Sequence, residues 1–140
     1  MALTVTPHLN FRAQAREALA FYHRVFGGEL MAVTYAQAHA ARNEADADLV
    51  MFGQVEAPSG FRVMAYDVPT DLSWDRGDRA FFVSIQSAEA QEISMHWQRL
   101  AEGATIQQDL APSGWSPLYG MLTDRFGVTW VMSVVPQMPA

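Results

Sequence analysis

An internal repeat organises this sequence. A shift of 75 positions aligns four pairs of identical residues: Ala15 with Ala90, Glu17 with Glu92, Arg24 with Arg99, and Gly28 with Gly103. Two amphipathic helices can share such residues by chance, but each segment also lies between one apolar run and a series of further runs. The pattern predicts a single α+β domain over 1–140, built of two strand–helix–three-strand modules, 1–67 and 78–136, joined by a linker at 68–77.

Hydrophobic periodicity locates the elements. Apolar residues recur at helical spacing from Ala15 to Phe26, where Gly27 and Gly28 end the predicted helix. The second helix is predicted to begin at Ser87 as its N-cap, with Glu89 in its first turn. The predicted strands are 4–11, 30–35, 49–55, 61–66, 80–86, 104–108, 118–122 and 128–135. Residues 37–48 fit either a short helix or a mobile loop, and the prolines in 109–120 predict irregular structure over most of that segment.

Composition removes several classes of chemistry. The chain has 140 residues and a formal net charge of −6, its nine basic residues are all arginine, and it contains no cysteine. Thiolate nucleophiles, cysteine-bound zinc, disulfides and lysine Schiff bases are therefore excluded. Scattered arginines in an acidic chain argue against a nucleic-acid partner. The sequence shows no signal-peptide pattern and no apolar run long enough to cross a membrane, so we expect a cytoplasmic protein without a membrane partner.

Several motifs resemble those of one superfamily. The first half carries Thr6-Pro7-His8-Leu9-Asn10-Phe11, a helix with Phe21-Tyr22 leading to Phe26-Gly27-Gly28-Glu29-Leu30, and Val63-Met64-Ala65-Tyr66-Asp67. The second half carries Trp115, Tyr119-Gly120 and Asp124-Arg125-Phe126-Gly127-Val128-Thr129-Trp130. Together these resemble the vicinal oxygen chelate superfamily of glyoxalases, bleomycin-resistance proteins and dioxygenases, and within it the PhnB-like branch. The resemblance implies two βαβββ modules that curl into open cups, commonly in a homodimer.

Some relatives in this branch are described as ubiquinone-pathway methyltransferases. A nucleotide-binding methyltransferase of the doubly wound type would need a glycine-rich loop between a strand and a helix. This sequence has no such loop. The sequence therefore gives that activity no support.

The resemblance also implies where a metal would be bound. Metal-dependent members of the superfamily use His, Gln or Glu side chains from the first and last strands of each module. Of those four strands, the first offers His8, the fourth has only Asp67 just past its end, the fifth has only Gln86, and the eighth has no histidine or carboxylate. We therefore expect no metal site of the superfamily type and predict no cofactor, with a recruited divalent metal as the alternative.

Strand alternation selects the candidate ligand-binding residues. His8 and Asn10 share one face of the first strand, with Leu9 and Phe11 on the other. His8 is either a hydrogen-bonding or acid–base group or a satisfied, partly buried side chain. In later strands the candidates are Phe52, Gln54, Met64 and Tyr66, and the loop before the seventh strand adds Trp115 and Tyr119. Arg62 shares a face with Met64 and either binds a carboxylate or phosphate or lies exposed at an edge.

Three functions remain open, because no catalytic constellation is evident. The first is a homodimeric protein that binds a small molecule in its cup without a metal. The second is a metal-dependent or metal-recruiting lyase, isomerase or dioxygenase with His8 in the site. The third is a domain that stabilises an assembly and whose cup is vestigial.

Overall fold

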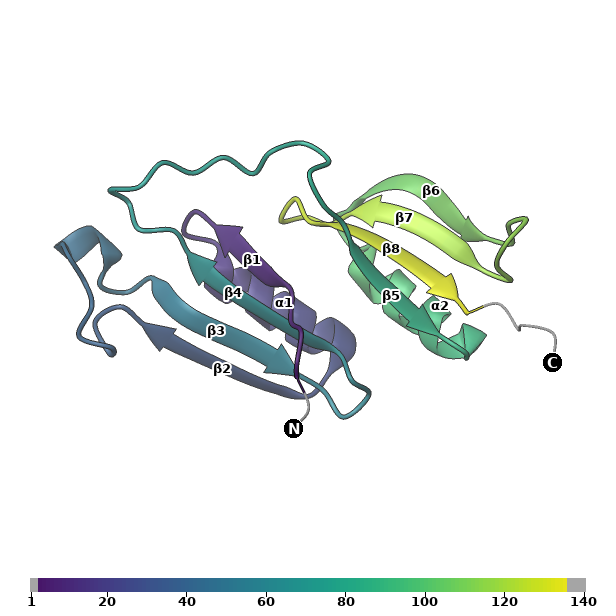
Figure 1. The fold of residues 1–140 in the computed structure, drawn as a ribbon, viewed down its shortest axis with the longest axis horizontal. Helices are drawn as coiled ribbons and strands as arrows, with labels where there is room; N and C mark the ends of the chain where they lie inside the picture. The colour runs from purple at the N-terminus through teal and green to yellow at the C-terminus, as the bar shows by residue number, and fades with distance from the viewer. Residues whose placement is uncertain (1–2, 136–140) are drawn as a thin grey trace. The chain divides into compact units, whose positions relative to one another are not determined.

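Each half of the chain folds as one strand, one helix and three further strands (Figure 1). The computed structural model describes residues 3–135 and divides the chain into two units, 1–76 and 77–140. The predicted α+β fold of two βαβββ modules is confirmed, and each sheet is open rather than closed into a barrel. Neither helix within residues 3–135 is long and apolar enough to span a membrane.

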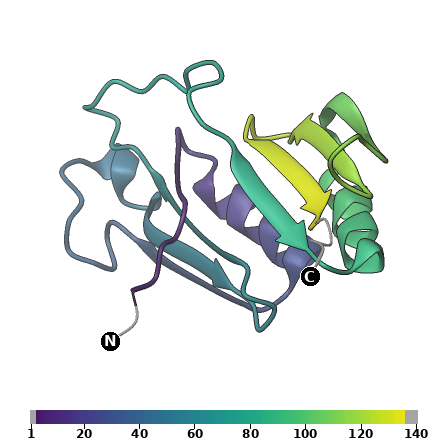
Figure 2. The same ribbon diagram turned by 45° about the vertical axis from the view of Figure 1, so that its right-hand side comes forward.

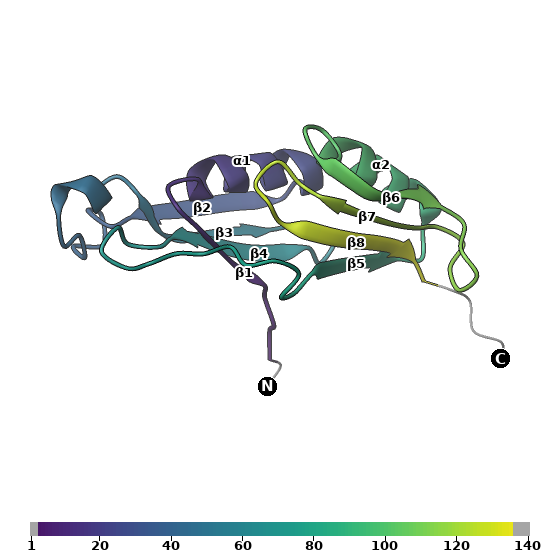
Figure 3. The ribbon, with the colours of Figure 1, turned by 90° about the horizontal axis from the view of Figure 1, so that it is seen from above.

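The first unit is a four-stranded sheet with the strand order β1-β4-β3-β2, in which β1 runs parallel to β4 and the other pairs are antiparallel. Its elements are β1 (His8–Phe11), α1 (Ala15–Phe26), β2 (Glu29–Thr34), β3 (Val50–Glu56) and β4 (Arg62–Asp67). The apolar stripe of α1 packs on β2, β3 and β4. In the view of Figure 3, each helix lies along one face of its own sheet.

A glycine allows α1 to approach the sheet closely. A Cβ atom at Gly53, in the middle of β3, would lie only 2.3 Å from a terminal methyl group of Leu19 and 3.0 Å from the carbonyl oxygen of Ala65. Leu19 is fully buried at this contact. The helix therefore occupies one face of the sheet and leaves the opposite face of β1, β4, β3 and β2 uncovered by it.

The second unit repeats this arrangement with the strand order β5-β8-β7-β6. Its elements are β5 (Val83–Ser87), α2 (Ala90–Leu100), β6 (Thr105–Ala111), β7 (Tyr119–Thr123) and β8 (Thr129–Val134). Gly120 in β7 takes the place that Gly53 has in β3, since a Cβ there would lie 2.8 Å from the indole ring of Trp97 in α2. The predicted turn at Asp124–Gly127 is confirmed by the bond from the Gly127 N–H to the Asp124 carbonyl oxygen (3.0 Å).

One prediction for the helix of this unit is wrong. Ser87 is not the N-cap of α2 but the last residue of β5, where it pairs with Val134, and Glu89 occupies the N-cap position. The Ser87 hydroxyl still serves the helix entry, because it accepts a hydrogen bond from the Glu89 N–H (3.0 Å) and donates one to Glu92 (3.2 Å). The segment 109–120 is irregular over most of its length, as predicted, although β6 continues to Ala111 and β7 begins at Tyr119.

Within the first unit, hydrogen bonds join the segment 37–48 to the segment 68–76. Both segments can be followed in Figure 2. Residues 37–48 form turns and one short 3₁₀ helix (Glu44–Asp46), which is closer to the predicted loop than to the predicted helix. The buried Asp46 carboxylate accepts hydrogen bonds from the N–H (3.2 Å) and hydroxyl (2.8 Å) of Thr70. Farther along, the Trp74 indole N–H donates to the Asn10 carbonyl oxygen of β1 (3.1 Å). This part of the predicted linker is therefore anchored to the unit that it leaves.

Candidate functional site

The candidate site is the face of the first sheet that lies opposite α1, which we call the open face. Alternation and strand register place three rows of side chains across it. The middle row is Met31, Gln54, Met64 and His8; the next is Val33, Phe52, Tyr66 and Asn10; and the third is Glu29, Glu56 and Arg62. Six of the eight predicted ligand-binding residues thus occupy two adjacent rows, about 7 Å apart.

His8 is oriented by its neighbours on the open face. Its Nδ1 atom lies 2.9 Å from the side-chain oxygen of Asn10, the residue predicted to share its face of the strand. Its ring also packs edge-to-face against Tyr66, with ring centroids 5.2 Å apart and planes at 71°. Both His8 and Asn10 are solvent-exposed. The imidazole is therefore held in place while its outer edge stays accessible.

An ion pair fills the third row. Arg62 Nη1 lies 2.7 Å from Glu56 Oε1, and Gln54 Nε2 donates to Glu56 Oε2 (3.0 Å). The Arg62 Nε–H also donates to the Thr6 hydroxyl (3.3 Å). The predicted exposed state of Arg62 is wrong, because the guanidinium is partly buried, and the carboxylate that it binds is that of Glu56 within the chain. The ion pair lies at one end of the face, next to the apolar and aromatic rows.

Asp67 belongs to the opposite face. It is the last residue of β4 rather than a residue just past the strand, and its side chain is 2% exposed. Its Oδ1 atom accepts from the Ala15 N–H at the start of α1 (2.9 Å), and its Oδ2 atom accepts from the Val50 N–H at the start of β3 (2.9 Å). Both carboxylate oxygens hold the fold together, so Asp67 is not a candidate ligand on the open face.

The donor set does not fit a metal of the superfamily type. On β1 and β4 the candidates are His8 and Asp67, and Asp67 is buried on the far face with both oxygens occupied. On β5 the only candidate is Gln86, and β8 carries neither imidazole nor carboxylate. Within the described part of the chain, no three histidine, aspartate or glutamate side chains gather closely enough to hold one ion.

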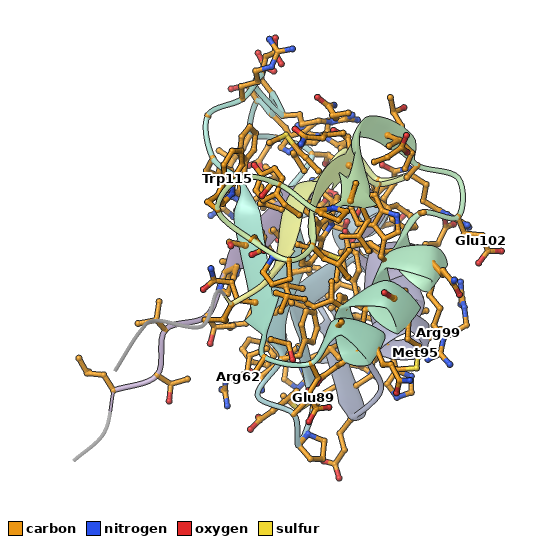
Figure 4. The ribbon with its side chains drawn as sticks, turned by 90° about the vertical axis from the view of Figure 1, so that its right-hand side faces the viewer. Arg62, Glu89, Met95, Arg99, Glu102 and Trp115 are labelled. Carbon is orange, nitrogen blue, oxygen red and sulfur yellow. The ribbon has the colours of Figure 1, made fainter. Side chains whose placement is uncertain are left out.

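Trp115 and Tyr119 belong to the second unit, so the structure does not join them to the six residues of the open face. Tyr119 is the first residue of β7, and Trp115 is carried on the loop before it (Figure 4). Their rings meet edge-to-face at 5.2 Å. Although Trp115 is 63% exposed, its loop is ordered, because the Ser116 N–H donates to the Ser113 hydroxyl (3.1 Å) and the Ser116 hydroxyl is itself buried against the Val134 carbonyl oxygen (2.6 Å).

Sequence reasoning missed Met31 and Val33. They lie on the open face opposite Gln54 and Phe52, and the Met31 side chain is 50% exposed. The alternation of Leu30, Met31, Ala32 and Val33 was visible, but all four residues are apolar, so polarity did not reveal which side faces the helix. Only the register with β3 decides the face.

The fold places this chain in a structural class. Two βαβββ units with open sheets define the fold of the glyoxalase and bleomycin-resistance proteins. A glyoxylase/bleomycin resistance protein/dioxygenase domain from Frankia shares it, with a TM-score of 0.66 at 11% sequence identity over 97% of this chain and 99% of that one. At this identity the likeness shows the fold alone.

Sequence comparison then identifies the family. Residues 3–133 match the family described as 3-demethylubiquinone-9 3-methyltransferase, and the chain belongs to this PhnB-like family. The crystal structure of protein PA1353 from Pseudomonas aeruginosa is similar at 30% identity, covering 97% of this chain and all of the other, with a TM-score of 0.82. A PhnB protein from Bacillus cereus is 19% identical with a TM-score of 0.69, covering 95% of this chain and all of that one. Protein YjdN of Escherichia coli K12 is 23% identical over 98% of this chain and 99% of its own length.

The expected resemblance to the vicinal oxygen chelate superfamily, in its PhnB-like branch, is therefore confirmed.

Proposed function

We propose that this PhnB-like protein binds a small apolar or aromatic molecule on the open face of its first sheet, without a catalytic metal. The observation that carries the proposal is the pair of adjacent rows on that face, in which apolar and aromatic side chains alternate with a few polar groups. Met31, Phe52 and Met64 provide an adaptable apolar surface, and Tyr66 adds a ring with a polar tip. Gln54, Asn10 and His8 provide hydrogen bonds that could orient a ligand.

Charge on the face favours a ligand without a strong charge of its own. Arg62 is already paired with Glu56 at 2.7 Å. An anionic ligand would have to displace that carboxylate from a partly buried guanidinium, which costs binding energy. The unpaired excess charge of the third row is that of Glu29, which also disfavours anions. Trp115 and Tyr119, with their exposed indole and adjoining phenol, are proposed to bind apolar ligand surface on the second unit.

The structure gives no support to a methyltransferase that binds a nucleotide cofactor in a glycine-rich loop. The family's name refers to a methyltransferase, but the connections between β1 and α1 (12–14) and between β5 and α2 (88–89) contain no glycine. A nucleotide-binding loop of the doubly wound kind needs glycines at that place. Binding on the open face requires no such loop.

Elemental analysis of the purified protein, followed by a divalent-ion titration, tests this proposal. We expect no stoichiometric metal, and an affinity for an aromatic probe such as phenol that is unchanged by a chelator. Stoichiometric, tightly held metal would contradict the proposal and favour the second candidate, a metal-dependent or metal-recruiting lyase, isomerase or dioxygenase. The exposed and oriented imidazole of His8 favours that candidate. It predicts an enzymatic activity that is lost in His8→Ala. In the wild type, that activity would be lost on metal removal and restored by added divalent ions.

We further propose that the protein is a cytoplasmic homodimer. Each sheet ends in strands with one free backbone edge, β1 and β2 in the first unit and β5 and β6 in the second. Unpaired strand edges are usually covered in native proteins, and a second copy of the chain is one way to cover them. Among the residues of the first unit that the structure describes, the Trp74 indole covers part of the β1 edge at the Asn10 carbonyl oxygen.

A further inference from the structure

The hydrogen bond between His8 and Asn10 determines which imidazole nitrogen carries a proton. Nδ1 of His8 lies 2.9 Å from Oδ1 of Asn10, and an amide oxygen can only accept. In this orientation of the Asn10 amide, Nδ1 carries the hydrogen. Because a neutral imidazole has only one N–H group, Nε2 is left with a free lone pair.

The strand and its neighbours hold this pair of side chains in place. Residues 8 and 10 point to the same side of β1, which puts their side chains within reach of each other. The strand itself is fixed, because the Met64 N–H donates to the Pro7 carbonyl oxygen (2.9 Å) and the Val68 N–H donates to that of Phe11 (2.8 Å). The edge-to-face contact with Tyr66 restricts rotation of the imidazole ring.

We infer that Asn10 is a positioning residue that presents Nε2 of His8 as a hydrogen-bond acceptor, so that the open face selects ligands carrying a hydroxyl or N–H donor on an apolar or aromatic body. The inference rests on the proposed function, since it names the ligand chemistry of the same face. Asn10 acts through His8 and needs no contact with the ligand. The Asn10 amide is neutral, so it fixes the tautomer without adding a charge to the apolar rows.

Imidazole ¹⁵N chemical shifts of the neutral histidines test the tautomer directly. The His8 signals are assigned by their loss in His8→Gln. His23 serves as an internal reference, because its Nε2 lies 2.9 Å from the Gly28 carbonyl oxygen and must carry the hydrogen there, the opposite tautomer. We expect a protonated Nδ1 in His8, a shift toward a mixture of tautomers in Asn10→Ala, and retention of the wild-type tautomer in Asn10→Asp, whose carboxylate also accepts. A proton on Nε2 of His8, or no change in Asn10→Ala, would overturn the inference.

Two matched probes test the ligand chemistry. Phenol carries a hydroxyl donor, whereas in anisole that hydrogen is replaced by a methyl group. One hydrogen bond corresponds to roughly a threefold to tenfold preference for phenol in the wild type. We expect the preference to fall to about one in Asn10→Ala and in His8→Gln, and to persist in Asn10→Asp.

The outcomes separate this inference from the function on which it rests. Equal binding of phenol and anisole by the wild type overturns the inference, although it leaves the open face as a binding surface. Binding of neither probe, with the expected tautomer observed, overturns the proposed function for aromatic ligands, while the role of Asn10 in fixing His8 is supported by the tautomer alone.

Discussion

The carboxylate of Asp67 is a single buried group that joins three elements of the first unit. It terminates β4 and accepts hydrogen bonds from the first N–H groups of α1 and of β3, both at 2.9 Å. A side-chain amide has only one oxygen, so Asp67→Asn would turn an NH₂ group toward one of these backbone donors. A buried donor without an acceptor costs about 1–3 kcal/mol.

We therefore expect Asp67→Asn to lower the free energy of unfolding by about 1–3 kcal/mol, measured by urea denaturation. The matched control is Asp71→Asn, since Asp71 pairs with Arg42 at the surface, where the two side chains are 45% and 64% exposed. That control should change stability by less than about 1 kcal/mol. Equal effects of the two substitutions would contradict the structural role of Asp67.

Each sheet has one glycine, Gly53 or Gly120, directly against a side chain of its helix. In Gly120→Ala the new Cβ would lie 2.8 Å from the Trp97 ring and 3.0 Å from the Leu110 Cα, so the indole and the β6 backbone would have to move. We expect a loss of about 1–3 kcal/mol in the free energy of unfolding, as for other overpacked cores. Gly114→Ala is the control, because no atom lies within 4 Å of its Cβ position. A Gly120→Ala protein as stable as the control would show that α2 sits farther from β7 than described.

At the scale of elements, Tyr35 connects the end of β2 to the end of β4. Its hydroxyl donates to the Asp67 carbonyl oxygen at 2.7 Å, and its side chain is 6% exposed. Burial raises the pKa of Tyr35, and the neighbouring Tyr66, Asp46 and Asp67 raise it further. Because the folded pKa lies above the unfolded value of about 10, this group contributes its full stability below pH 10 and loses it as the pH rises through the folded pKa.

Tyr35→Phe tests this connection. At neutral pH we expect it to lower the free energy of unfolding by about 1 kcal/mol, because the hydroxyl bond to Asp67 is lost. Above about pH 10 the gap between wild type and variant should narrow, since the variant lacks the ionisation that destabilises the wild type. The measurement is urea unfolding between pH 7 and 11. A gap that stays constant across this range would contradict the raised pKa.

The elements that were predicted well are those whose signal is local. The stripe from Ala15 to Phe26 gave α1 at its observed bounds, and the alternation of His8, Leu9, Asn10 and Phe11 gave the correct faces of β1. Ser87 was misassigned because serine favours helix N-caps in general, whereas here pairing with Val134 extends β5 through it. The end of β6 was missed because its residues are mostly polar and exposed, and pairing of Ala111 with Tyr119 decides its structure.

In the candidate site, too, the features with a local sequence signal were predicted and those that depend on long-range pairing were not. Local alternation was enough to select six residues of the open face, but the rows that join them depend on the register among four strands. The role of Asp67 could not be found locally, since its partners Ala15 and Val50 are distant in sequence. Gly53 and Gly120, each inside a predicted strand, are a sequence signal of the close helix contact that the structure shows at both positions.

At the scale of the whole molecule, the proposed homodimer predicts a particle mass. Light scattering coupled to gel filtration should give about twice the 15.6 kDa chain mass, because a second copy would cover strand edges that each open sheet leaves unpaired. The result should be the same at several protein concentrations in the micromolar range. A mass of one chain throughout that range would contradict the proposal.

A titration with phenol of protein labelled at its methionine methyl groups, with and without a chelator, tests metal-free binding on the open face. Met31 and Met64 lie on the open face, whereas Met95 is exposed on α2 and Met132 is fully buried, so the chain supplies its own controls. We predict saturable shifts of the Met31 and Met64 methyl signals with and without the chelator, and little change at Met95 and Met132. Shifts that spare Met31 and Met64, or that vanish when metal is removed, would contradict metal-free binding on this face.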